Sequence, residues 1–111
     1  MKPDELRGHL EALVLAVLED EALHGYAIME ELSRLSDGSI ELPTGTLYPA
    51  LRRLERVGYL KSSWSIVGGR KRRTYQLTRA GKKALEDERS AWQKFTSTIG
   101  AVLGSTQTDR A

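Results

Sequence analysis

Arginine side chains are concentrated in one short stretch, GTLYPALRRLERVGYL, at residues 45–60. On a helical wheel its leucines fall within one sector, and the opposite side carries Tyr48, Pro49, Arg52, Arg53 and Arg56. Guanidinium groups bind phosphate oxygens and guanine edges, and a tyrosine hydroxyl can donate to a phosphate. We therefore expect this face to bind a polyanion.

The distribution of charge supports a polyanionic partner. Residues 1–42 carry three basic and ten acidic side chains (net −7), residues 43–75 carry eight and one (net +7), and residues 76–111 carry six and four (net +2). A concentrated positive block attracts a polyanion even when the whole chain is close to neutral. A solvated charged surface is the alternative explanation.

A second basic cluster, GGRKRR, lies between two predicted strands. Apolar and polar residues alternate from residue 60 to 66, and RRTYQLT returns with Tyr75 and Leu77 on one face. The two glycines can form the connecting turn. The sequence thus predicts a β-hairpin, with a simple solvated turn as the alternative, whose tip carries Arg70, Lys71, Arg72 and Arg73.

Three helices are predicted to precede this hairpin. Helical spacing of apolar residues predicts a first helix from about residue 4 or 9 to 20, and a second from about 24 to 36 with Leu35 facing inward. The third is the arginine-bearing segment, which Thr44 is expected to cap and Pro49 to distort in its first turn. Backbone N–H groups around Thr44 to Thr46 could hold a phosphate, although capping alone would explain both threonines.

A fourth, long helix is predicted from about residue 79 to 103, with Thr78 as its cap. At 1.5 Å per residue it would extend about 37 Å, which exceeds the size of the preceding domain. Its apolar stripe would lie in water on a monomer, so we expect a homodimer. The predicted interface combines this helix with the first one and comprises Leu10, Val14, Val17, Leu85, Trp92, Phe95, Ile99 and Val102.

Trp92 is also a candidate binding residue for a small ligand. A planar indole near a two-fold axis would meet its symmetry mate and could hold a flat aromatic compound between the two rings. Plain packing at the dimer interface is the alternative explanation for this residue.

Catalysis is not expected from the residue types present. The chain has no cysteine, and its two histidines, His9 and His24, have no ligand-type side chain at metal-binding spacing. No nucleophile, base and orienting group recur together, so we expect no enzyme activity, no metal and no cofactor. The longest apolar run, residues 13–18, is far shorter than the roughly 20 residues that cross a bilayer, so we expect a cytoplasmic protein with no membrane partner.

Three helices followed by a hairpin is the order of a winged helix-turn-helix, a mainly α architecture with a β-hairpin wing (α+β). In that fold the third helix enters the major groove of double-stranded DNA, and the hairpin lies along the flanking backbone. We expect residues 1–78 to form this DNA-binding domain, residues 79–103 the dimerisation helix, and residues 104–111 a disordered tail.

Four segments also carry a family resemblance. LHGYAIMEEL at 23–32, GTLYPALRRLERVGYL at 45–60, Trp64, and RRTYQLTRAGKKAL at 72–85 resemble the PadR family of bacterial transcriptional regulators. The similarity extends over about residues 8–103, and its motifs have the family's order and spacing. With one helix after the wing, the chain is similar to the short subfamily.

The resemblance implies a homodimeric repressor that binds a pseudo-palindromic operator and has the C-terminal helix at its dimer interface. It also implies a small aromatic effector, whose identity the sequence does not specify, as it does not specify the operator, the regulated genes or the sign of regulation. The alternative function is a protein-interaction adaptor that uses the winged helix and the C-terminal helix without DNA. An adaptor offers no reason for a net charge of +7 on the two elements that would face a duplex.

Overall fold

The chain folds into a winged helix-turn-helix domain followed by one long helix. The computed structural model describes residues 3–6 and 8–104. Its elements, in chain order, are α1 (Pro3–Leu6), α2 (Leu10–Val17), β1 (Leu23–His24), α3 (Gly25–Leu35), α4 (Thr44–Arg56), β2 (Leu60–Val67), β3 (Arg70–Leu77) and α5 (Arg79–Leu103). The predicted fold class is confirmed. Except for Gly104, the tail predicted to be disordered lies outside the described residues.

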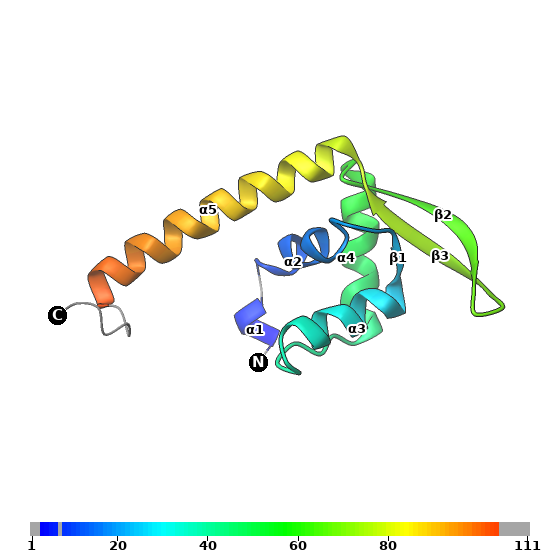
Figure 1. Cartoon of the computed structure of the whole chain (residues 1–111), viewed down its shortest axis with the longest axis horizontal. Coiled ribbons are helices and arrows are strands. Elements are labelled where there is room, and N and C mark those ends of the chain that lie inside the picture. The colour runs from blue at the N-terminus through cyan, green and yellow to red at the C-terminus, as the bar shows by residue number, and fades with distance from the viewer. Residues whose placement is uncertain (1–2, 7, 105–111) are drawn as a thin grey trace.

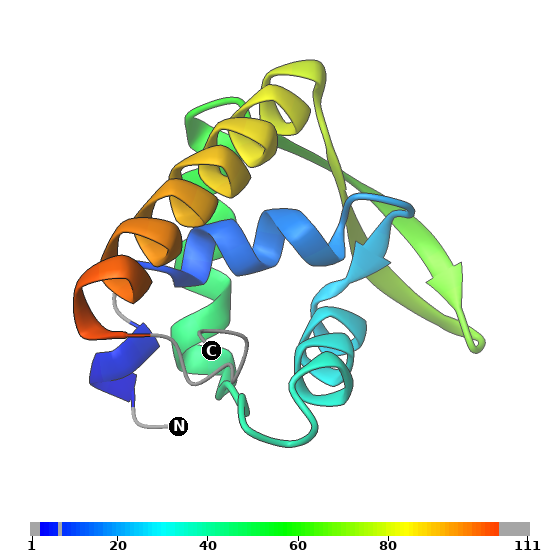
Figure 2. The ribbon, with the colours of Figure 1, turned by 60° about the vertical axis from the view of Figure 1, so that its left-hand side comes forward.

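The domain and its two extensions are clear in Figure 1. Helices α2, α3 and α4 form one body, the hairpin β2–β3 leaves it on one side, and α5 leaves it on the other. Helix α2 contacts α3, α4 and α5, so it lies at the centre of the arrangement (Figure 2). The molecule measures 57 × 28 × 23 Å, and α5 accounts for much of the long dimension.

The N-terminal region departs from the single predicted helix. It forms two helices, and Gly8 between them has a φ of 85°, which a right-handed helix does not accommodate. Helix α2 then ends at Val17, three residues before the predicted end. No helix among residues 3–6 and 8–104 is long and apolar enough to cross a membrane.

The wing belongs to a three-stranded antiparallel sheet with strand order β1-β3-β2. Strands β2 and β3 pair from Leu60 opposite Leu77 to Val67 opposite Arg70, as a hairpin with a two-residue loop requires. Both loop glycines have positive φ, 58° and 77°, which a type I′ turn demands. Strand β1, which pairs Leu23 with Tyr75, was not predicted, because two residues carry no detectable alternation.

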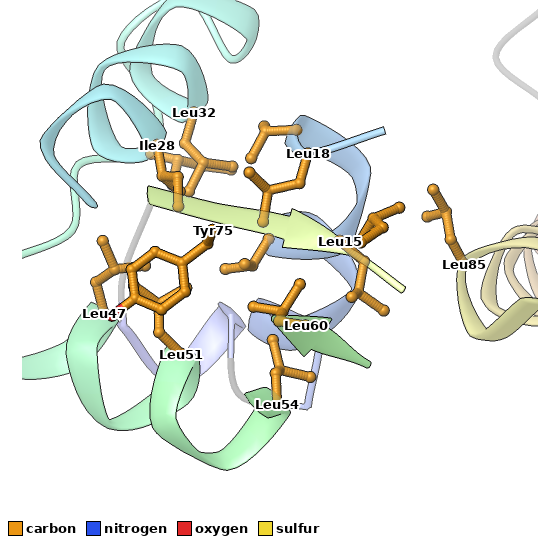
Figure 3. Close-up of a cluster of buried hydrophobic side chains, with 14 of the residues drawn as sticks. Leu15, Leu18, Ile28, Leu32, Leu47, Leu51, Leu54, Leu60, Tyr75 and Leu85 are labelled. Atoms are coloured by element: carbon orange, nitrogen blue, oxygen red, sulfur yellow. The ribbon is translucent and has the colours of Figure 1, made fainter. Parts of the chain in front are cut away.

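The core lies where the helices meet the base of the sheet. It includes Leu15, Leu18, Ile28, Leu32, Leu47, Leu51, Leu54, Leu60, Tyr75 and Leu85 (Figure 3). The prediction that Leu35 faces inward is wrong. The residue is 61% exposed, because α3 ends there and the chain turns away.

The start of α5 is attached closely to the domain. The hydroxyl of Thr78 accepts the backbone N–H of Gly81 at 3.0 Å, which confirms the predicted cap, and donates to the carbonyl of Gly58 at 2.6 Å. The backbone N–H of Thr78 donates to the carbonyl of Tyr59 at 3.1 Å. Gly81 is buried against that same carbonyl, and a Cβ atom at position 81 would overlap its oxygen.

We predict that Gly81→Ala destabilises the protein. Overlap with a backbone carbonyl cannot be relieved by rotating a side chain, so we expect the free energy of unfolding to fall by about 1–3 kcal/mol. Gly45→Ala is the matched control, since nothing lies within 4 Å of a Cβ there, and it should leave stability unchanged or raise it by up to about 1 kcal/mol. Urea unfolding at equal protein concentration measures both, and a Gly81→Ala protein as stable as the wild type would contradict the prediction.

Candidate nucleic-acid interface

Helix α4 presents its basic side because its apolar side is fully used by the core. Leu47, Leu51 and Leu54 are at most 1% exposed. The opposite side carries Arg52 and Arg56, both exposed, as the wheel predicted. Pro49 lies on the exposed side of α4, and the helix continues through it. The proline for which a distorted first turn was predicted therefore does not break the helix.

The start of α4 differs from the predicted cap. Pro43 occupies the N-cap position and makes no side-chain cap, and Thr44 is the first helical residue. Thr46 and Leu47 donate their backbone N–H groups to the carbonyl of Pro43. The backbone N–H groups of Thr44 and Gly45 at the N-terminus of α4 therefore have no intrahelical acceptor. Unpaired N–H groups of this kind are the ones that bind anions at helix N-termini. Thr44, Gly45 and Thr46 are exposed.

Tyr48 is positioned by the core rather than by the exposed stripe. Its ring is half-buried and packs against the core cluster. Its hydroxyl lies over Gly25 at the start of α3, where a Cβ atom would collide with it. Tyr48 therefore joins the two helices of the helix-turn-helix, a role that the wheel could not show because α3 is remote in sequence.

The arginines of α4 differ in how they are paired. Arg53 donates to Glu11 of α2, so its charge is compensated within the domain. Within the part of the chain that the structure describes, Arg52 and Arg56 make no ion pair. These two guanidinium groups are the ones available to an external anion.

The wing carries the rest of the basic residues. Arg70, Lys71 and Arg73 are exposed and Arg72 is half-buried. The Lys71 ammonium and the Arg73 guanidinium lie 5.2 and 5.6 Å from the centre of the Trp64 ring, within the range of cation–π contacts. Trp64 packs against these two cations within the hairpin, yet it stays 58% exposed.

A separate apolar surface runs along α5. Trp92, Phe95, Ile99 and Val102 are exposed, as predicted for an interface that needs a second chain. The rings of Trp92 and Phe95 stack at 5.7 Å, and His9 meets Trp92 edge-on at 5.6 Å. These aromatic rings form one continuous cluster at the exposed side of the α2–α5 contact.

A groove of about 330 Å³ lies between α2 and α5, and Trp92 is one of the residues that line it. Leu13, Ala16 and Leu85 contribute its apolar wall. Arg89 of α5 donates two hydrogen bonds of 2.8 Å to Glu19, which follows α2, and this bonding lowers the pKa of the Glu19 carboxyl. Nothing in the sequence pattern predicts this pair, since 70 residues separate its members.

Three residues of the predicted dimer interface require correction. Val14, Val17 and Leu85 are 0%, 9% and 3% exposed, and all three belong to the core of their own protomer. Their helical spacing had indicated an apolar face without indicating which partner covers it. Leu10 is partly buried and stays in the predicted interface with the four exposed residues of α5.

Comparison with known proteins identifies the family. The model of the Transcriptional regulator PadR-like family matches residues 14–87, about two thirds of the chain. The chain belongs to the PadR-like family. The match covers α3, α4 and the wing completely and continues into the first turns of α5.

Individual PadR relatives agree with this assignment. Transcriptional regulator Rv3488 of Mycobacterium tuberculosis is 40% identical over 80 residues, which cover 72% of each protein. A PadR family transcriptional regulator from Eggerthella lenta is similar with a TM-score of 0.73 and 34% identity, over 93% of this chain and 85% of that one. Bacillus subtilis PadR, solved in complex with operator DNA, has a TM-score of 0.64 and 26% identity, over 72% of this chain and 46% of that one.

The pairing of the α4 arginines predicts unequal contributions to DNA binding by this PadR-like regulator. Arg52→Ala and Arg56→Ala should each weaken binding to a selected duplex by about 1–3 kcal/mol, and relax the preference at one base pair where a guanine is contacted. Arg53→Ala should cost less, because Glu11 already compensates its charge. Fluorescence anisotropy with selected and scrambled duplexes measures this order, and three equal losses would contradict it.

Proposed function

We propose that this protein is a homodimeric, sequence-specific repressor that binds a pseudo-palindromic operator and is released by a small aromatic ligand. The observation that carries the proposal is the convergence of cations from two elements. Arg52 and Arg56 of α4 and Arg73 of β3 line one hollow, on a side of α4 that the core does not use. Helix and wing thus contribute cations to the same hollow.

This surface fits the docking geometry of a winged helix. With α4 in the major groove, Arg52 and Arg56 would face bases or phosphates, and the wing would follow the flanking backbone. The free N–H groups at Thr44 and Gly45 would face a phosphate at the start of the helix. The operator complex of the related Bacillus subtilis PadR supports DNA as the partner.

The apolar side of α5 supports a homodimer. Val102 and Leu103 are 81% and 78% exposed at the far end of the helix, well beyond the domain. A contiguous apolar stripe of this kind marks an interaction surface. In a dimer with a two-fold axis, the stripe of one protomer would pack against the same stripe of its partner. Leu10 lies on the adjoining α2 and would extend the contact.

The groove beside Trp92 supports a ligand site. An aromatic compound could stack on Trp92 while contacting the apolar wall formed by α2 and α5. Because the same groove adjoins the proposed dimer contact, an occupant would alter how the two protomers meet. Such a change would alter the spacing of the two α4 helices and hence operator affinity.

DNA binding should depend steeply on salt. If each protomer neutralises about three to five phosphates, dimer affinity should fall by roughly 10³ to 10⁵ between 50 and 200 mM salt. Sites selected from random duplexes should be pseudo-palindromic, with half-site centres about one helical turn apart. Salt titration of the selected duplex measures this, and an affinity that ignores salt would exclude DNA in favour of the adaptor function.

Trp92→Ala should separate the ligand role from plain packing. We expect a protein that stays dimeric, still binds DNA and no longer responds to aromatic compounds, whereas loss of the dimer would show that Trp92 serves packing alone. Sedimentation and DNA titration with and without compound measure these outcomes. Trp64→Phe serves for the fluorescence measurement, since it leaves Trp92 as the single tryptophan of the chain and the quenching of Trp92 then reports on the groove. A monomeric wild type at micromolar concentration would contradict both roles.

A further inference from the structure

The hollow between α4 and the wing has a chemical composition of its own. Its lining combines three guanidinium groups with one carboxylate and one phenol, contributed by Arg52, Arg56, Arg73, Glu55 and Tyr75. Glu55 is the single acidic residue among residues 43–75. The alternation of β3 predicts only that Tyr75 shares one face with Leu77, and nothing in the sequence pattern predicts a role for Glu55.

Tyr75 has a buried ring and an unused hydroxyl. Its side chain is 4% exposed, and Figure 3 shows the ring against α4 beside Leu47 and Leu51. The hydroxyl makes no hydrogen bond to another described residue, and no fully buried polar side-chain atom of those residues lacks a partner. The hydroxyl is therefore not fully buried, and the residue that carries it lines the hollow. Burial raises the pKa of Tyr75, so the hydroxyl remains a proton donor at neutral pH.

Arg73 is held in place from two sides. The hydroxyl of Ser62 accepts from Arg73 Nε at 2.9 Å and donates to Glu55 Oε2 at 2.6 Å. The same Glu55 oxygen lies 3.7 Å from Arg73 Nη2. On its other side the guanidinium rests on the Trp64 ring. Glu55 thereby joins α4, β2 and β3 through one carboxylate and sets where Arg73 points.

We propose that this hollow seats one phosphodiester of the DNA backbone, with the Tyr75 hydroxyl as an uncharged donor, Arg73 as a cation, and Glu55 as the positioning residue that fixes Arg73. The proposal rests on the proposed DNA-binding function and assigns one of its contacts. With α4 in the major groove, the backbone that borders the groove passes between helix and wing, where the hollow lies. A phosphate oxygen supplies the acceptor that the buried phenol lacks, beside compensating positive charge.

Tyr75→Phe tests the donor directly. The change removes one oxygen atom and keeps the buried ring, so thermal unfolding should be unchanged. Affinity should fall about tenfold on selected and scrambled duplexes alike, because hydrogen bonds to charged groups are strong and the backbone carries no sequence. The slope of affinity against salt should be preserved, since a neutral hydroxyl releases no counterion. Tyr59→Phe is the matched control, because Tyr59 is half-buried on the α5 side of the domain and lines a different hollow.

Glu55→Gln tests the positioning role. Glutamine can still accept from Ser62 but no longer attracts Arg73, so DNA affinity should fall even though a negative charge has been removed. Arg73→Gln should lower the affinity and reduce the salt slope by about one. Adding Arg73→Gln to Glu55→Gln should then cost much less than in the wild type. Tighter binding by Glu55→Gln would overturn the positioning role, because it would show that the carboxylate merely repels DNA.

A neutral methylphosphonate placed at successive linkages of the duplex identifies the phosphate. One linkage in each half-site should weaken the wild type, and should weaken Tyr75→Phe by a smaller factor, because Arg73 still contacts that phosphate in the variant. If the hollow binds free phosphate instead, no methylphosphonate position will show coupling with Tyr75→Phe. If Tyr75→Phe loses affinity for the selected duplex alone, the hydroxyl contacts a base. Either result would overturn the proposed phosphodiester site. A Tyr75→Phe protein that binds DNA as tightly as the wild type would refute the phosphodiester site and leave the proposed DNA-binding function intact. A wild type that binds no duplex would refute the function itself.

Discussion

Burial of the leucine face of α4 is the contact on which the functional surface depends. Leu47, Leu51 and Leu54 pack against α2, α3 and the base of the sheet, and this packing determines which side of α4 faces outward. A helix with 3.6 residues per turn cannot bury these positions without exposing Arg52 and Arg56. The same core includes Tyr75 of β3, so the position of the wing relative to α4 is determined by the same set of contacts.

Charge compensation then distinguishes arginines that are equivalent in sequence. Arg53 and Arg73 have carboxylate partners in the domain, whereas Arg52 and Arg56 have none among the described residues. The partners come from α2 and from α4 itself, which are fixed by the core. The acidic N-terminal part of the chain thus supplies more than a net charge: through Glu11 it neutralises one cation of α4, and through Glu19 it joins the segment after α2 to α5.

Elements with strong local signals could be predicted from the sequence, and contacts between distant segments could not. The bounds of α5 follow from Thr78 and the apolar spacing, and the wing register follows from the alternation around Gly68 and Gly69. In contrast, the helical spacing of Val14, Val17 and Leu85 is the same whether a side chain faces its own domain or a second copy. The inward position of Tyr48 depends on α3, and the Glu55–Ser62–Arg73 cluster depends on the register of the sheet, so neither has a signature within its own segment.

The attachment of α5 at one end has a mechanical consequence. Thr78 and Gly81 clamp its first turn, and the Arg89–Glu19 pair holds it about two turns after Gly81, so the distal half extends from the domain as a lever. For a rigid helix about 37 Å long, a rotation of about 5° at the clamp moves the far end by about 3 Å. That displacement is close to the axial rise of one base pair, so in the proposed dimer a small rotation at the base of α5 would be enough to move the two domains out of register with a duplex.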